Sequence, residues 1–191
     1  MNFLDKFNNS KNIRFDLFKK TFEICKKRKL KIIVETGTSR GKKKFYFFNQ
    51  HNWKDGMSTI MFAEYVGNMN GHLHTCDISN TNIEAAKKFT TKFSNYITYN
   101  VNDSVFFLTN FVGKIDLLYL DSLDGHNPVL ASNHQLEEIK NSFKKLDYDS
   151  LVLLDDKGTK TNLSINFLLK NKFQILHETK YQVLLSKNNI E

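Results

Sequence analysis

One stretch decides the fold: residues 32–41, which read Ile-Ile-Val-Glu-Thr-Gly-Thr-Ser-Arg-Gly. Its first three residues are β-branched and predict a short buried strand, and the glycines and small polar residues after them predict a tight turn. A turn of this kind, at the carboxyl end of the first strand, is where open α/β sheets bind nucleotide-like ligands. The spacing is Glu-x-Gly-x-x-x-Gly, and Glu35 stands where the dinucleotide fingerprint Gly-x-Gly-x-x-Gly needs a glycine. The stretch therefore predicts a nucleotide-like ligand that is not a dinucleotide.

Strands and helices alternate along the rest of the chain. Short apolar runs predict further strands at 72–77, 96–101, 115–121, 150–156, 173–178 and 181–186. Apolar residues at helical spacing predict helices at 14–28, 58–67, 81–93 and 162–170, a short helix from 104, and a helix that follows a long loop ending near 133. The last two strands are close enough for a hairpin. We expect an α/β fold: a seven-stranded, mostly parallel sheet with an antiparallel C-terminal hairpin strand and helices on both faces.

The length of 191 residues suits a single domain, 1–191, that begins with an N-terminal helical segment, 1–30. Residues 42–55 interrupt the pattern between the glycine turn and the next helix, and they carry five aromatic residues, including the only Trp. We interpret 42–55 as an inserted, lid-like loop that covers the ligand or forms a wall for the substrate. A surface insertion that packs its own aromatic residues is the alternative.

Acidic or polar residues end the successive parallel strands. They are Glu35, Asp77, the group Asn102-Asp103-Ser104, Asp121, and the pair Asp155-Asp156. A single acid after a strand is commonly a helix cap, but the carboxyl ends of parallel strands share one edge of the sheet. Five such ends in succession therefore predict a site along that edge.

The glycine turn and this order of acids resemble the pattern of class I S-adenosylmethionine-dependent methyltransferases, over about residues 31–187. The resemblance implies a Rossmann-like fold and S-adenosylmethionine as the cofactor. In that family the first-strand acid and glycines hold the amino-acid part of the cofactor, the second-strand acid binds the ribose hydroxyls, and the polar pair after the third strand flanks the adenine. The cofactor-binding residues implied here are Glu35, Gly37, Gly41, Ser58, Asp77, Ile78, Asp103, Ser104 and Asp121.

Asp77 is well suited to this role, because a carboxylate offers two acceptor oxygens to two adjacent hydroxyl donors.

A second resemblance concerns Asp121, Asp155 and Asp156, which match the metal site of catechol-type O-methyltransferases. Carboxylate oxygens are the ligands that Mg²⁺ prefers, and a bound Mg²⁺ would lower the pKa of an acceptor hydroxyl and orient it toward the sulfonium methyl. The alternative is that Asp155 and Asp156 cap the next helix while Asp121 contacts cofactor or substrate.

The loop after Asp121 departs from the catechol-type pattern. It reads Ser-Leu-Asp-Gly-His, without the lysine base of that subfamily. His126 is the candidate base, because the pKa of an unperturbed histidine lies near neutral pH. The predicted catalytic residues are therefore Asp121 and His126, and a surface histidine is the alternative at 126.

The charge balance is basic, with a formal net charge of +8. Only three of the 28 basic residues are arginine, whose planar fork suits phosphates and bases. Nucleic acid is therefore a disfavoured partner. No apolar run exceeds four residues and the start of the chain has no apolar core, so we expect no membrane segment and a cytoplasmic protein.

The function that these patterns favour is O-methylation of a small-molecule hydroxyl, with Mg²⁺ as an optional cofactor. The Asn/Asp-Pro-Pro-aromatic motif of amino-group methyltransferases is absent after the fourth strand, where residues 120–123 read Leu-Asp-Ser-Leu. Two alternatives stay open: a non-catalytic module that binds S-adenosylmethionine or another nucleotide, and an RNA-binding or RNA-modifying protein. Whether the chain forms a homodimer is also left open.

Overall fold

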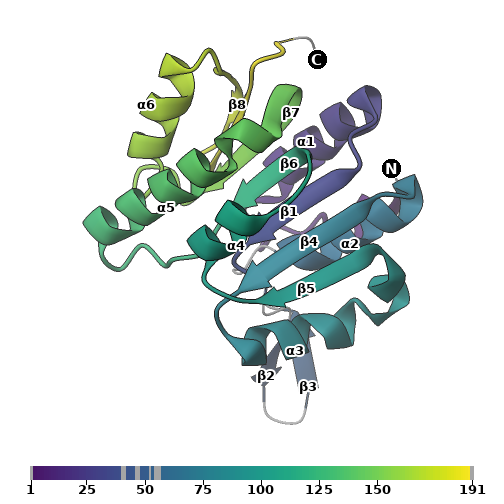
Figure 1. The fold of residues 1–191 in the computed structure, drawn as a ribbon. Helices are drawn as coiled ribbons and strands as arrows, with labels where there is room; N and C mark the ends of the chain where they lie inside the picture. Colours follow the sequence, from purple (N-terminus) through teal and green to yellow (C-terminus); the bar gives the residue numbers. More distant parts are fainter. Residues whose placement is uncertain (1, 40–41, 46–47, 52, 54–56, 190–191) are drawn as a thin grey trace.

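The computed structural model describes residues 2–39, 42–45, 48–51, 53 and 57–189. Figure 1 shows a twisted sheet with helices against it. The strands are β1 (Ile32–Thr36), β2 (Lys42–Phe45), β3 (Phe48–His51), β4 (His72–Asp77), β5 (Ile97–Val101), β6 (Ile115–Leu120), β7 (Leu146–Asp155), β8 (Gln174–Glu178) and β9 (Gln182–Ser186). The α-helices are α1 (Phe15–Arg28), α2 (Ser58–Met69), α3 (Asn80–Phe89), α4 (Ser104–Asn110), α5 (Pro128–Ser142) and α6 (Asn162–Lys170). Short 3-10 helices span Asn2–Phe7, Thr91–Tyr96 and Phe143–Lys145.

The main sheet has seven strands in the order β5-β4-β1-β6-β7-β9-β8. Strands β5, β4, β1, β6 and β7 are parallel, and β9 pairs antiparallel with both β7 and β8. This arrangement confirms the expected fold class, including the C-terminal hairpin strand. The order reverses at β1, because the chain adds β4 and β5 on one side and then β6 and β7 on the other.

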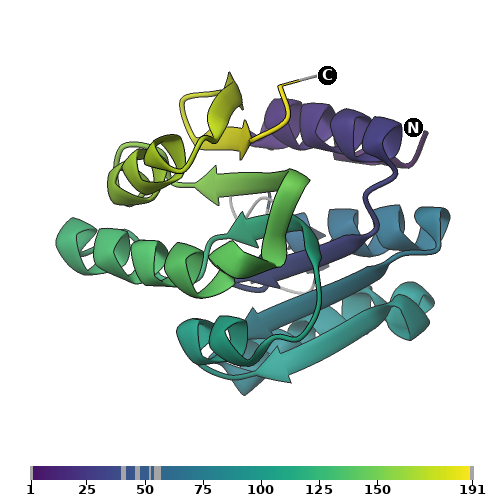
Figure 2. The same cartoon turned by 45° about the horizontal axis from the view of Figure 1, so that its top comes forward.

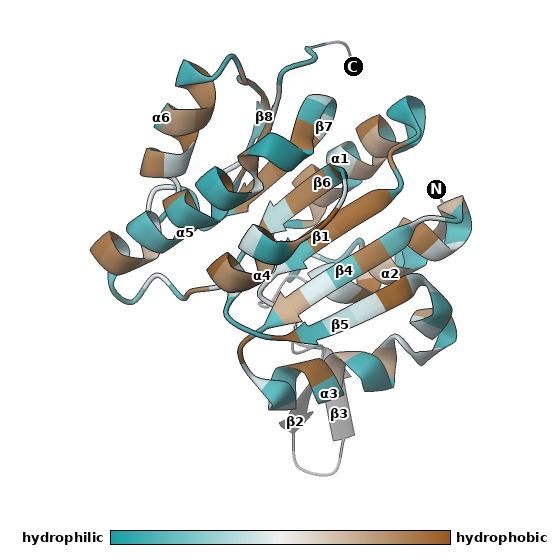
Figure 3. Cartoon of the chain, in the orientation of Figure 1, coloured by the Kyte–Doolittle hydropathy of each residue, from teal (hydrophilic) through white to brown (hydrophobic). Residues whose placement is uncertain are grey.

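The central strands β1, β6, β7 and β9 are largely buried on both faces, so two separate cores form. On one face α1 and α2 pack through aromatic residues: Phe18 and Phe62 both contact the ring of Tyr119 on β6. On the other face Leu118, the neighbour of Tyr119, belongs to a cluster with Ile139 of α5 and other residues of α4 and α6. Figure 2 shows the two helical layers, and Figure 3 shows the apolar colouring of the strands between them. None of the helices in the described residues is long and apolar enough to cross a membrane.

Some helix boundaries differ from the sequence-based expectation. Helix α5 begins at Pro128 instead of near 133, because the side chain of Asn127 caps it by accepting from the backbone N–H of Leu130 and proline fits the first turn. The expected helix 81–93 ends at Phe89 and is followed by a 3-10 helix. Its N-cap is Ser79, so the helix begins one residue earlier than expected, at Asn80.

The segment 42–55 is not a simple loop. Strands β2 and β3 form an antiparallel hairpin in which Phe45 pairs with Phe48. Trp53 is partly buried against the core beneath α1 and α2. The proposal that 42–55 covers the ligand stays a prediction, because several of its residues lie outside the described ones.

Gly37 allows β1 and β6 to approach each other just beyond the end of their pairing. Its φ is +83°, and a Cβ at this position would lie 2.0 Å from the carbonyl oxygen of Asp121. The backbone N–H of Gly37 donates to the carbonyl of Cys76, and the N–H of Asp121 donates to the carbonyl of Thr36. The turn after β1 is therefore fixed to both neighbouring strands at a point where no side chain fits.

We expect Gly37→Ala to lower the free energy of unfolding by about 3 kcal/mol, because strain at positive φ adds to a clash with backbone atoms that cannot move away. Gly158→Ala is the matched control, since its φ is +84° and nothing lies within 4 Å of its Cβ position. The control should lose only about 1 kcal/mol. Urea unfolding of both variants measures the difference, and equal losses would contradict the role of close approach.

Candidate functional site

The register of the sheet brings the strand ends together as the sequence predicts. Thr36 pairs with Cys76 and with Leu120, and Leu120 pairs with Leu154. The next residue along each strand is Gly37, Asp77, Asp121 or Asp155, so these residues form a row across the carboxyl edge of the sheet. The edge lies at the position where the strand order reverses, which is where open α/β sheets bind their ligands.

Two cavities open along this edge. The first has a volume of about 360 Å³, and Arg14, Ser58, Asp77, Asp121, Asp124 and Asp156 are among its lining residues. The second has a volume of about 280 Å³, and Asp103, Ser104, Leu123 and His134 are among its lining residues. Both are lined by Gly37, Asp77, Ile78 and Ser122, so the cavities meet at the end of β4 and the turn after β1.

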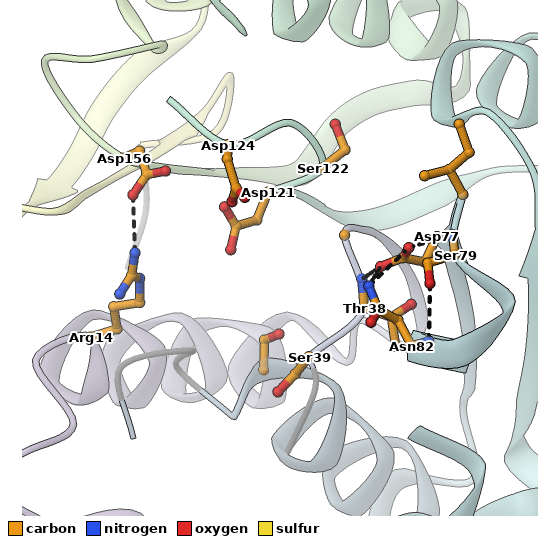
Figure 4. Close-up of a pocket in the computed structure, with 13 residues that line it drawn as sticks. Arg14, Thr38, Ser39, Asp77, Ser79, Asn82, Asp121, Ser122, Asp124 and Asp156 are labelled. Carbon is orange, nitrogen blue, oxygen red and sulfur yellow. Dashed lines mark hydrogen bonds and ion pairs between the residues drawn. The ribbon is translucent and has the colours of Figure 1, made fainter. Parts of the chain in front are cut away.

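Asp77 lies between the two cavities and is oriented by its own surroundings. Its carboxylate accepts hydrogen bonds from the backbone N–H of Ser79 at 2.8 Å and of Thr38 at 3.1 Å. The side-chain amide of Asn82 donates to both carboxylate oxygens. Figure 4 shows this group at one end of the first cavity, with Arg14 and Asp156 at the other. A carboxylate with two oxygens and several lone pairs can still accept from a ligand hydroxyl here.

The adenine-flanking residues that the resemblance implies lie in the second cavity. The carboxylate of Asp103 caps α4 by accepting from the N–H of Phe106 at 2.8 Å. Asp103 is therefore both a helix cap and a lining residue of the second cavity. The hydroxyl of Ser104 is 2.8 Å from Nε2 of His134, a residue of α5 that the sequence analysis does not single out. Ile78 is 77% exposed although it lines both cavities. Gly41 lies outside the described residues.

Glu35 faces the interior of the protein and not the cavities. It has no exposed surface, and its carboxylate accepts from the hydroxyls of Ser58, Thr59 and Thr75 at 2.6, 2.9 and 2.7 Å. The same threonines bind the glycine turn: the hydroxyl of Thr59 accepts from the N–H of Ser39. Glu35 therefore positions the turn from behind.

Burial raises the pKa of Glu35 from about 4.5 to about 7, although the hydroxyl donors oppose the shift. The folded protein keeps the proton up to about pH 7, whereas the unfolded chain releases it near pH 4.5, so stability falls as the pH rises through this window. The expected loss is about 3 kcal/mol, at about 1.4 kcal/mol for each pKa unit.

We expect Glu35→Gln to remove this pH dependence, because glutamine has no proton to release. Urea unfolding at about pH 5 and about pH 8 measures it, with Glu84→Gln, an exposed site on α3, as the control. The control should show the same change in the free energy of unfolding with pH as the wild-type protein. A Glu35→Gln variant with that same change would show that Glu35 does not titrate in this range.

Asp121, Asp155 and Asp156, here called the carboxylate triad, lie together as the sequence predicts. Each offers an oxygen within 4.8 Å of the others. The structure adds two cations that sequence reasoning missed. The Nε of Arg14, the residue before α1, is 2.8 and 2.7 Å from the two oxygens of Asp155. The Nζ of Lys160, in the loop after β7, is 2.9 Å from Asp121 and 3.3 Å from Asp156.

The two cations stay charged. Burial opposes the charge on Arg14 and on Lys160, but the neighbouring carboxylates outweigh it and raise the pKa of both side chains above their usual range. Lys160, which is 2% exposed, is therefore not a proton acceptor. It is a fixed positive charge among three carboxyl groups, of which Asp121 has a pKa raised well above its usual range by burial and by the neighbouring Asp155.

The triad does not fit a divalent ion in this arrangement. Five of the six carboxylate oxygens already have a donor within 3.3 Å, from Arg14 or Lys160. The sixth, Oδ2 of Asp121, is 3.4 Å from the hydroxyl of Tyr119, which lies closer to Asp155 at 3.0 Å. Mg²⁺ demands close, near-octahedral oxygen ligands, so these contacts would have to be broken first.

His126, the base candidate from the sequence, lies away from the cavities, whereas Asp124 of the same loop lines one of them. His126 is exposed and is not among the described residues that line either cavity. Asp124, which the sequence analysis does not single out, is also exposed but lines the first cavity together with Asp121, and Figure 4 labels both among the residues of that cavity. Both residues belong to the loop after β6, and the sequence does not show which of them this loop directs into the cavity.

Comparison with known proteins agrees with this geometry. A family model described as a methyltransferase domain matches residues 53–157, more than half of the chain. Curated protein sequences give no match. The chain belongs to the class I S-adenosylmethionine-dependent methyltransferases.

Several solved structures share the fold at low sequence identity. The SAH-bound methyltransferase PaMTH1 from Podospora anserina has a TM-score of 0.62 and 12% identity, over 87% of this chain and 76% of that one. An rRNA methylase from Streptococcus thermophilus has a TM-score of 0.60 and 9% identity, over 88% of this chain and 94% of that one. The N-methyltransferase NodS from Bradyrhizobium japonicum has a TM-score of 0.59 and 12% identity, over 91% and 94%. These names cover different acceptors, so they do not specify one.

Proposed function

We propose that the protein transfers the methyl group of S-adenosylmethionine to a hydroxyl of a small molecule, and that the two cavities hold the cofactor and the acceptor. The observation that carries the proposal is the position of Asp121 and Asp124, whose carboxylates share the first cavity with Asp77. A carboxylate at this place can accept the proton that a hydroxyl must lose.

The residues that line the two cavities suggest one orientation for the cofactor. Asp77 would accept the two ribose hydroxyls, because it lies where the cavities meet. The adenine would then enter the second cavity, between the apolar side chains of Ile78 and Leu123 and near Ser104. The amino-acid part would lie along Thr38, Ser39 and Ser58 in the first cavity. This orientation directs the sulfonium methyl toward Asp121 and Asp124.

The reaction is an in-line displacement. The acceptor oxygen forms a bond to the methyl carbon while the bond from that carbon to sulfur breaks, and S-adenosylhomocysteine leaves. The hydroxyl proton passes to the carboxylate of Asp124. Asp121, held by Lys160 and by the weak contact from Tyr119, would orient the acceptor. Positioning of this kind supplies most of the rate in such a transfer.

Other expectations from the sequence stay predictions. Mg²⁺ assistance is among them, and the donors on the carboxylate triad argue against it. A cytoplasmic location and a homodimer are the others.

RNA is the competing acceptor, since the chain is basic. The basic residues 26–29, Lys-Lys-Arg-Lys, weigh against RNA as the acceptor. They end α1 and precede β1, so they lie at the opposite edge of the sheet from the cavities.

The acceptor class is tested with S-adenosylmethionine labelled in its methyl group. The protein is incubated with a cell extract that has been separated into small molecules and RNA. We expect label in the small-molecule fraction, in products heavier by one methyl group by mass spectrometry, and no label in RNA. Label that appears only in RNA and disappears after ribonuclease treatment would overturn the proposed acceptor.

The proton acceptor is tested by Asp124→Asn. We expect kcat to fall by about 100-fold, because the amide cannot take up a proton, while the Kd for S-adenosylmethionine stays unchanged. His126→Asn, in the same loop, should keep kcat within about twofold. The opposite result, a large loss in His126→Asn alone, would assign the base to His126 as the sequence predicts.

A further inference from the structure

We propose that Arg14 and Lys160 take the place of a divalent metal at the carboxylate triad, so that the reaction at this site needs no metal ion. The inference rests on the proposed function, because it concerns the same cavity. It makes Arg14 and Lys160 positioning residues: they act through Asp121, Asp155 and Asp156.

Arg14 covers the end of β7. Its Nε contacts both oxygens of Asp155, and its Nη2 is 3.0 Å from Asp156. The side chain of Arg14 is 12% exposed and that of Asp155 is fully buried, so water competes little for this pair. The guanidinium is planar and always charged, which suits two adjacent carboxylates better than a lysine would.

Lys160 covers the other side of the triad. Its ammonium contacts Asp121, Asp156 and the carbonyl oxygen of Leu123 at 2.9, 3.3 and 3.1 Å. An ammonium has three hydrogens, so its donors are used within the protein. The carbonyl of Leu123 belongs to the loop that carries Asp124, and Lys160 therefore fixes this loop beside Asp121.

The charges nearly balance. Three carboxyl groups face two cations, so at most one net negative charge remains, because burial and Asp155 raise the pKa of Asp121 well above its usual range. A site that is neutral or singly negative can hold the sulfonium without a metal. A divalent ion would instead need at least two of these carboxylates released from their donors. The three aspartates occupy the sequence positions that resemble the catechol-type metal site, but here Arg14 and Lys160 supply the positive charge in place of a metal ion.

Mn²⁺ alone is the probe, because its electron paramagnetic resonance signal weakens when the ion binds a protein. We expect the wild-type protein to leave the free Mn²⁺ signal unchanged. The double variant Arg14→Met/Lys160→Met removes both cations and keeps side chains of similar length, so it should bind one Mn²⁺ and lower the free signal accordingly.

The matched control is Arg28→Met/Lys145→Met, which loses the same charge elsewhere. Arg28 contacts Ser186, and Lys145 contacts backbone carbonyls, away from the triad. The control should bind no Mn²⁺. If the Arg14→Met/Lys160→Met variant fails to fold by circular dichroism, the single variants Arg14→Met and Lys160→Met replace it.

Two results would overturn the inference. One is Mn²⁺ binding by the wild-type protein that is lost in Asp155→Asn. The other is a folded variant without these cations that still binds no Mn²⁺. Calorimetry with S-adenosylmethionine on the same samples separates this inference from the proposed function, since a protein that binds no cofactor contradicts the function whatever Mn²⁺ does.

Discussion

The ion pair between Arg14 and Asp155 is the interaction on which the site depends. Asp155 has no exposed surface, and a buried carboxylate stays ionised only where charge and hydrogen bonds compensate for lost water. Arg14 lies 141 residues earlier, so this pair fixes the start of α1 to the carboxyl edge of the sheet. Asp156, Asp121 and Lys160 extend the same network to the loop that carries Asp124. The N-cap residue of α1 thus belongs to the candidate site, while the helix itself packs in the core.

The edge of the sheet separates two tasks. At one end Asp77, held by the turn after β1 and the start of α3, presents its oxygens to a ligand. At the other end charged side chains from the residue before α1, the ends of β6 and β7 and the loop after β7 pair with one another around the point where the methyl group would be transferred. Gly37 joins the two ends, because only a glycine allows the turn to contact the backbone of Asp121. Glu35 supports that turn from the core through Ser58, Thr59 and Thr75.

The sequence predicts the strand ends well for a physical reason. Parallel strands that are buried on both faces read as continuous apolar runs, and the first polar residue after each run marks the edge of the sheet. Asp121 and Asp155 were found in this way. The strand before Asp77 is less apolar, since it contains His72 and His74, and Asp77 was found as the acid that ends it. The inward direction of Glu35 could not be found, since a strand that is buried on both faces has no alternation to show which side a residue faces.

The cations were beyond sequence reasoning for a different reason. Arg14 and Lys160 reach the carboxylate triad only through contacts between distant parts of the chain, and each looks like an ordinary surface residue in its own segment. The choice between Asp124 and His126 depends on the path of one loop. The start of α5 was expected near 133, but the sequence contains the signal for the correct start, because Asn127-Pro128 is a cap followed by a first-turn proline.

Calorimetric titration with S-adenosylmethionine tests the central claim, that the cofactor binds where the two cavities meet at Asp77. The variant Asp77→Asn keeps the shape of the side chain and loses its charge. We expect the wild-type protein to bind one cofactor, and the variant to bind about 100-fold more weakly, as two hydrogen bonds to a charged group imply. Asp147→Asn, at the amino-terminal end of β7, should bind as the wild type does. Equal affinity of wild type and Asp77→Asn would contradict the claim and place the cofactor elsewhere.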